Sequence, residues 1–238
     1  MKRIISAVLL LVLCCTLLTG CFCKHEWQDA TCTTPTTCAL CDKTEGEALG
    51  HMAGDFVDGE VDFEAKTVRS YQNCKICGES LHSEINDLTS FVSGDSFVYT
   101  PNQFNRAMDN RFSNYTFEID TLDSGALISM IYNASGSAIG AIMYVTEDSE
   151  SITMADLDSA ICEGMICYWY TQDAAVVVEL MKGILCGCDI TITDASSDGT
   201  LSTIIDTYSN NASYSKNGVS YLLTINDGHF VFLIAVND

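Results

Sequence analysis

Cysteine and histidine supply the most specific chemistry in this chain. Two Cys-x-x-Cys pairs, Cys38/Cys41 and Cys74/Cys77, each have histidines nearby in the sequence. Two thiolates at this spacing can bind one metal ion from a single tight turn, and a structural zinc ion takes four sulfur or nitrogen ligands in a tetrahedron. The spacing therefore predicts closed zinc sites, which stabilise a fold and leave no position open for catalysis.

The first predicted site consists of three cysteines and one histidine: His25, Cys32, Cys38 and Cys41. The surrounding stretch resembles the short Cys/His-rich units that occur, often in tandem, in surface proteins of Gram-positive gut bacteria. The shared pattern is His-x-Trp, Ala-Thr-Cys, Pro, Thr-Cys-x-x-Cys, Thr-x-Gly and Gly-His. It is matched here by His25, Trp27, Ala30, Thr31, Cys32, Pro35, Thr37, Cys38, Cys41, Thr44, Gly46, Gly50 and His51. Asp42 departs from the pattern, because a glycine commonly follows the last cysteine. The resemblance implies one histidine and three cysteines per unit, closing four ligands around a metal.

A second unit begins at His51 and is degenerate, because it has no counterpart of Cys32. The predicted ligands of this weaker second site are His51, Cys74, Cys77 and His82. Two alternatives stay open. The Cys-x-x-Cys pairs of both units could together form one four-cysteine zinc ribbon, or the cysteines could form disulfides, as is common outside the cell.

The N-terminal residues 1–20 have the features of a lipoprotein signal peptide. Lys2 and Arg3 precede an apolar run that is too short for a typical membrane-spanning helix. The sequence Leu18-Thr19-Gly20-Cys21 resembles a bacterial lipobox. This resemblance implies cleavage before Cys21, a diacylglyceryl group on its sulfur, and a lipid-anchored protein on the extracytoplasmic face of the cell membrane.

The net charge of the chain restricts the classes of molecule that it can bind. The 238 residues carry a formal net charge of −21. An acidic surface of this kind repels phosphate backbones and anionic headgroups, so the charge argues against nucleic acid as a partner. We expect membrane contact through the lipid anchor alone, and an unknown extracellular protein or glycan as the ligand.

The elements that carry these residues fall into two parts. Residues 21–84 form the predicted Cys/His-rich, zinc-ribbon-like module, and residues 87–238 form a larger domain of alternating apolar strands and amphipathic helices. Its halves, residues 94–146 and 187–237, share an order of short strand, helix, edge strand and hairpin, joined by a helical connector at 152–186. We therefore predict an α+β fold in which a β-α-β-β-β unit is duplicated as a two-layer sandwich.

The larger domain offers no recognisable catalytic motif. His229 lies on a predicted turn, and the aromatic run Tyr168 to Tyr170 fits either a core or an exposed binding platform. Its four cysteines, predicted either as cross-paired disulfides or as buried thiols, are Cys162, Cys167, Cys186 and Cys188. The sequence thus predicts a non-enzymatic surface lipoprotein with structural zinc. The alternative is an extracellular hydrolase or other enzyme with a cleft between the two repeats.

Overall fold

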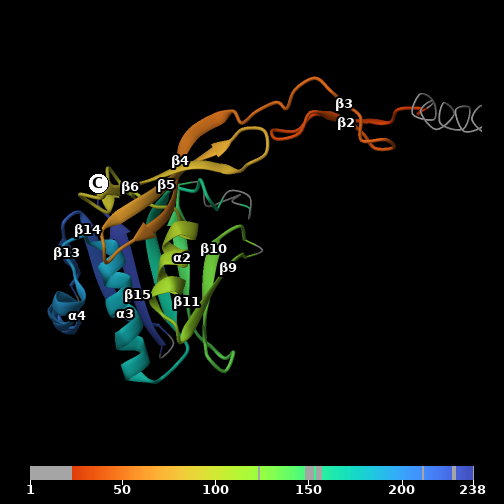
Figure 1. The fold of residues 1–238 in the computed structure, drawn as a ribbon. Helices are drawn as coiled ribbons and strands as arrows, with labels where there is room; N and C mark the ends of the chain where they lie inside the picture. The colour runs from red at the N-terminus through yellow and green to blue at the C-terminus, as the bar shows by residue number, and fades with distance from the viewer. Residues whose placement is uncertain are drawn as a thin grey trace, which may run out of the picture. The chain divides into compact units, whose positions relative to one another are not determined.

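The structure, a computed structural model, describes residues 23–122, 124–147, 153, 157–210, 212–226 and 229–237 (Figure 1). The predicted signal peptide and Cys21 lie outside these residues. The described chain divides into two compact units: residues up to Phe56 together with Tyr71–His82, and Val57–Ser70 together with the residues from Ser83 onward. Within the described part, none of the helices is both long and apolar enough to cross a membrane.

The first unit is built from short strands. Strands β1 (Trp27–Gln28), β2 (Thr36–Cys38) and β3 (Thr44–Glu45) form one antiparallel sheet. A second sheet contains β4 (Ala53–Asp62), β5 (Thr67–Cys74) and β6 (Ser80–Asp87), and the division between the two units falls inside all three strands.

This first unit has almost no apolar core. Among its described residues, the buried side chains are those of Cys32, Cys38 and Cys74. A chain segment that buries so little apolar surface needs another source of stability, such as disulfides or a metal. The sulfur atoms are therefore the structural centre of this unit.

The second unit contains a seven-stranded sheet in which every neighbouring pair is antiparallel, in the order β13-β14-β15-β12-β11-β10-β9. The strands are β9 (Tyr115–Thr121), β10 (Leu127–Asn133), β11 (Ala138–Thr146), β12 (Cys162–Trp169), β13 (Tyr214–Lys216), β14 (Val219–Asn226) and β15 (His229–Val236). A small hairpin, β7 (Val92–Ser93) with β8 (Ser96–Phe97), precedes them.

Three helices accompany the sheet: α2 (Pro101–Arg111), α3 (Ala174–Cys188) and α4 (Asp194–Ser209). Helix α2 starts where Thr100 and Gln103 cap each other reciprocally, and Asp173 caps α3 by accepting from the N–H of Ala175 at 3.0 Å. Figure 1 shows α2 and α3 in front of the strands, and the apolar side chains of the helices share one core with one face of the sheet.

The mixed composition expected from the sequence is confirmed, with three helices and antiparallel sheets in the described chain. Two local expectations were wrong. Strand β12, the middle strand of the sheet, lies in the first part of the segment 152–186 predicted as a helical connector, whereas the later part of that segment is helical, as α3. The short strand expected before the last helix is absent, because α3 continues to Cys188 and a turn follows, with the N–H of Ile192 donating to the carbonyl of Asp189 at 2.9 Å.

Candidate metal centre

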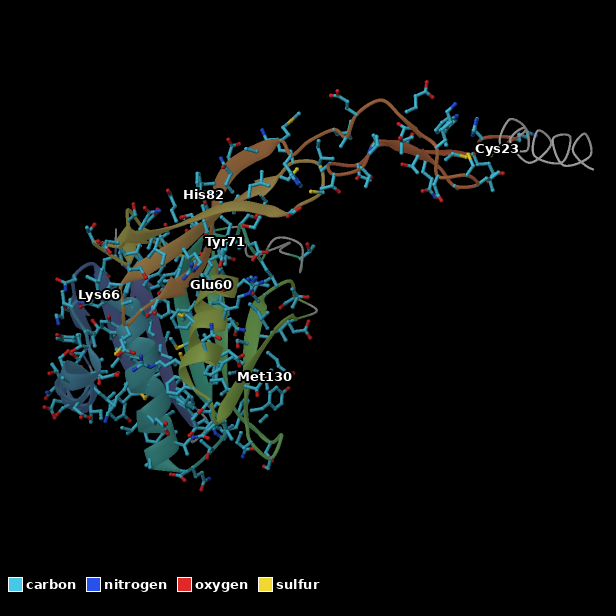
Figure 2. The ribbon with its side chains drawn as sticks, viewed as in Figure 1. Cys23, Glu60, Lys66, Tyr71, His82 and Met130 are labelled. Carbon is cyan, nitrogen blue, oxygen red and sulfur yellow. The ribbon has the colours of Figure 1, made fainter. Side chains whose placement is uncertain are left out.

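The first unit contains two clusters of potential metal ligands. The first cluster consists of Cys23, His25, Cys38 and Cys41, and the second of Cys32, His51, Cys74 and Cys77. In each cluster one ligand atom from every residue lies within 4.8 Å of the others. Cys23, labelled in Figure 2, belongs to the start of the described chain. Both clusters are thus sets of three cysteines and one histidine that could hold a metal ion.

The spacing of the ligand atoms fits tetrahedral zinc. In the first cluster the sulfurs of Cys23 and Cys38 are 3.9 Å apart, and the sulfur of Cys41 lies 3.4 Å from Nδ1 of His25. Zinc with bonds of about 2.3 Å to sulfur and about 2.0 Å to nitrogen separates two sulfurs by about 3.8 Å and a sulfur from a nitrogen by about 3.5 Å. Disulfide-bonded sulfurs would be only about 2.05 Å apart.

The second cluster repeats this geometry. The sulfurs of Cys32 and Cys74 are 3.7 Å apart, and the sulfur of Cys77 lies 3.5 Å from Nδ1 of His51. The other ring nitrogen of His51, Nε2, is 3.6 Å from a carboxylate oxygen of Glu79. A carboxylate near the second ring nitrogen is a common companion of metal-bound histidines.

The two Cys-x-x-Cys turns are built alike. The N–H of Leu40 donates to the sulfur of Cys38, and the N–H of Ile76 donates to the sulfur of Cys74, both at 3.4 Å. Each turn is followed by a residue at positive φ, Asp42 at 54° and Gly78 at 75°. The departure from glycine at Asp42 therefore leaves the turn intact, in line with the tolerance of aspartate for this conformation.

These turns favour thiolates. Burial acts to raise the pKa of the Cys38 thiol, but the N–H of Leu40 and the His25 side chain stabilise the thiolate more, and the pKa is lowered to about 6. The pKa of Cys74 is lowered to about 5, because hydrogen bonds from the backbone of Cys77 and Ile76 outweigh burial. The thiolate is the form that binds metals.

The grouping of the ligands differs from the sequence prediction. Cys32 was assigned to the first site, but its chain is paired with the residues just before His51: the N–H of Gly50 donates to the carbonyl of Cys32 at 3.0 Å. Cys32 thus joins the second cluster, and Cys23 takes its place in the first. His82 is in neither cluster, and its ring instead meets Phe56 edge-on, with centroids 5.9 Å apart. The two Cys-x-x-Cys pairs also lie in different clusters, so the structure does not bring them together as one four-cysteine ribbon.

The cysteines of the second unit are core residues. Cys162, Cys167, Cys186 and Cys188 are all buried, and all are free thiols, as are the other cysteines in the described chain. Of the two sequence-based readings of these four, the structure therefore contains the thiols rather than the disulfides. Burial raises the pKa of Cys162 and of Cys167 to about 12, which leaves them in the unreactive protonated form.

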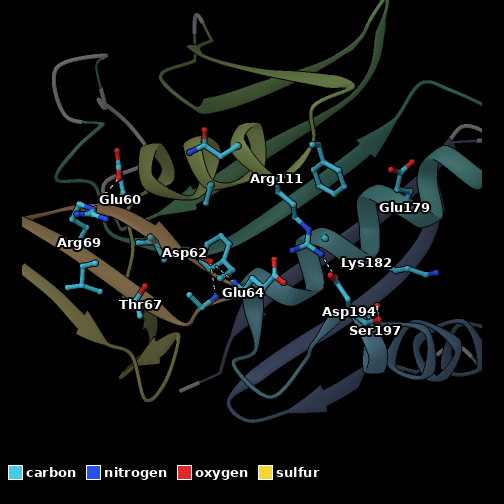
Figure 3. A pocket seen from close by; sticks show the side chains of 18 of the residues that line it. Glu60, Asp62, Glu64, Thr67, Arg69, Arg111, Glu179, Lys182, Asp194 and Ser197 are labelled. Atoms are coloured by element: carbon cyan, nitrogen blue, oxygen red, sulfur yellow. Dashed lines mark hydrogen bonds and ion pairs between the residues drawn. The ribbon is translucent and has the colours of Figure 1, made fainter.

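The second unit contains a cavity of about 1170 Å³ (Figure 3). Most carboxylates on its wall have partners: Asp194 pairs with Arg111, Glu60 lies 3.7 Å from Arg69, Glu179 accepts a hydrogen bond from a tyrosine, and Asp62 accepts from the backbone. Glu64 also lines the wall. His229 and Trp169, which the sequence analysis singled out, contact neighbouring parts of the second unit. Nδ1 of His229 lies 3.2 Å from the carbonyl oxygen of Trp169, and the Trp169 side chain is buried in the core.

We compared the chain with protein-family models, curated proteins and solved structures, and none of the three comparisons returned a match.

Proposed function

We propose that this protein is a lipid-anchored extracytoplasmic binding protein whose N-terminal module is held together by two structural zinc ions. The observation that carries the proposal is the pair of Cys3His clusters, whose sulfurs provide the buried side chains of the described first unit. Four protein ligands around each ion leave no position for a substrate, which is the arrangement of structural rather than catalytic zinc.

The remaining parts of the proposal come from the sequence and the topology. The lipobox-like sequence ending at Cys21 supports anchoring at the outer face of the cell membrane. The second unit is the binding part. We also propose that it arose by duplication, which is supported by the order of the sheet: β9-β10-β11 and β15-β14-β13 flank β12, and each set follows a helix, α2 or α4.

Native mass spectrometry of residues 22–238, purified without added metal, tests the zinc assignment. We expect two zinc ions per chain, lost on denaturation at acidic pH, when the cysteines become protonated. A native mass without metal, and lower by the hydrogens lost on forming disulfides, would contradict the proposal.

The lipid anchor is tested separately in a Gram-positive host. We expect the full chain to fractionate with membranes and the variant Cys21→Ser to remain unprocessed, because the lipid is attached through the sulfur. Equal processing and equal membrane association of the two proteins would show that Cys21 carries no lipid.

A further inference from the structure

The second face of the seven-stranded sheet is largely apolar and partly exposed. Its register aligns residues into rows across the strands. One row, taken from adjacent pairs in β10, β11, β12, β15 and β14, consists of Ile128, Met143, Ile166, Leu233 and Leu222. The next row consists of Met130, Ala141, Tyr168, Val231 and Thr224. Five adjacent strands at about 4.8 Å spacing make each row about 19 Å long.

In the described chain this face is only partly covered. The alternate residues of the same strands, such as Leu127, Ile142 and Phe232, are buried in the core under the helices. The side chains of the two rows lie outside that core cluster; Leu222 is 38% exposed, most of the others are half-buried, and Ala141 and Val231 are buried. Met130, labelled in Figure 2, is partly exposed in the same way. Contiguous apolar patches on a soluble protein mark interaction sites more often than chance.

Each row ends in a carboxylate on the edge strand β9. Asp120 pairs with Ile128, and Glu118 pairs with Met130. Both acidic side chains are exposed, and neither has an ion-pair partner among the described residues. An exposed carboxylate pair beside an apolar patch complements a partner that carries Lys or Arg next to its own apolar surface.

We propose that this open sheet face, defined by the two rows and by Glu118 and Asp120, binds a different protein through an apolar surface bordered by basic residues. A second copy of this chain is disfavoured as the occupant, because each copy carries a net charge of −21 and would repel the other. An anionic membrane surface is disfavoured for the same reason. The flexible side chains Met130 and Met143 suit a protein contact, since methionine adapts to irregular surfaces. This proposal rests on the proposed role of the second unit as a binding domain.

The test uses two synthetic amphipathic peptides, one with leucine and lysine faces and one with leucine and glutamate faces. Isothermal titration measures their binding to the zinc-loaded protein. Leu222→Glu places a charge on the open face, and Ile225→Glu is its matched control, because Ile225 is 47% exposed on the same strand but has the opposite orientation. Asp120→Lys reverses one edge charge at an exposed site and does not threaten the fold.

We expect the lysine peptide to bind, and both Leu222→Glu and Asp120→Lys to weaken it by about tenfold, corresponding to the loss of one well-packed or paired contact. Ile225→Glu should bind like the unmodified protein, and the glutamate peptide should not bind. Equal affinity for all variants would overturn the proposal.

Two other results would also overturn it. One is a dimer in sedimentation analysis that Leu222→Glu converts to a monomer, which would identify a second copy as the occupant. The other is binding of phosphatidylglycerol vesicles that Leu222→Glu abolishes. Because metal content is measured independently, a failure here is distinguishable from a failure of the zinc assignment.

Discussion

Cys32 lies between Cys23 and Cys38 in the sequence, yet it does not belong to the cluster that those two cysteines share. Its sulfur lies 3.7 Å from that of Cys74, in the second cluster. Replacing Cys32 with serine should therefore empty the second site and leave the first occupied. Replacing Cys23 should do the reverse, since Cys23 lies 3.9 Å from Cys38. Native mass spectrometry with domain-specific proteolysis should find one zinc ion in each variant, bound to different fragments.

His82→Asn is the matched control for this pair, because His82 packs against Phe56 outside both clusters. We expect it to retain two zinc ions. Loss of the second ion in His82→Asn, together with its retention in Cys32→Ser, would favour the ligand set predicted from the sequence over the one in the structure.

The sequence predicted that cysteines and histidines would cluster, but it grouped some of them wrongly. Residues far apart in the chain meet in such a cluster through tertiary pairing, which their spacing in the sequence does not reveal. The Cys-x-x-Cys turns are local, and each pair lies within a single cluster, as its spacing predicts. Cys32 was grouped with its nearest neighbours, whereas backbone pairing with Gly50 carries it to the later site. Cys23 was not assigned to either predicted site, although it lies only two residues before His25, which was assigned to the first.

At the scale of the elements, the central strand β12 is sensitive to a single added carbon. A Cβ on Gly164 would lie 2.5 Å from the carbonyl oxygen of Ile234 on β15. Backbone cannot yield as a side chain can, so we expect Gly164→Ala to lower the free energy of unfolding by about 1–3 kcal/mol. Urea unfolding followed by circular dichroism measures this change.

Gly199→Ala is the control on a helix. Gly199 lies within α4, and a Cβ there would meet nothing within 4 Å. Alanine should raise the stability by about 0.5–1 kcal/mol, because glycine is a poor helix former. Destabilisation of similar size in both variants would mean that the tight contact at Gly164 is not what limits the sheet.

Helices were easier to predict than β12 for a physical reason. Pro101 and the capping residue Thr100 mark the start of α2 locally, and Asp173 marks the start of α3. Strand β12 is in the middle of the sheet, with Met165 and Cys167 buried on one face and Ile166 and Tyr168 apolar on the other. A strand that is apolar on both faces loses the clear alternation that identifies half-buried strands.

At the scale of the whole molecule, the two units should differ in their dependence on metal. The described first unit buries little besides Cys32, Cys38 and Cys74, whereas the second has an extensive apolar core. A strong chelator should therefore unfold the first unit alone. Alkylation followed by mass spectrometry should then label the six cysteines from Cys23 to Cys77, while Cys162, Cys167 and Cys188 stay protected. Labelling of the core cysteines at the same rate would indicate that the units unfold together.

The second unit should also be sensitive to alkaline pH. Burial raises the pKa of Tyr99 and of Tyr144 well above the ordinary value, and it raises the pKa of Tyr221 as well. The folded protein keeps these phenols neutral, whereas the unfolded chain ionises them near pH 10, so stability is complete below pH 10 and falls above it. Each tyrosine contributes a slope of roughly 1.4 kcal/mol per pH unit.

Phenolate absorbance measures this effect. Of the 10 tyrosines, these three should ionise only when the fold is lost, in a step that coincides with the circular dichroism transition. Smooth ionisation of all the tyrosines before unfolding would contradict the burial of these rings.

The position of Cys23 in the first cluster has a consequence for the proposed order of maturation. Cys23 follows the predicted acylation site by two residues, a covalent reach of about 7 Å at most. An enzyme that acylates Cys21, as proposed, must reach the adjoining backbone, and a metal ion already bound to Cys23 would restrict that access. If Cys21 is acylated as proposed, acylation should come first and metal binding at Cys23 second, so that metal binding would complete the maturation of the N-terminal module.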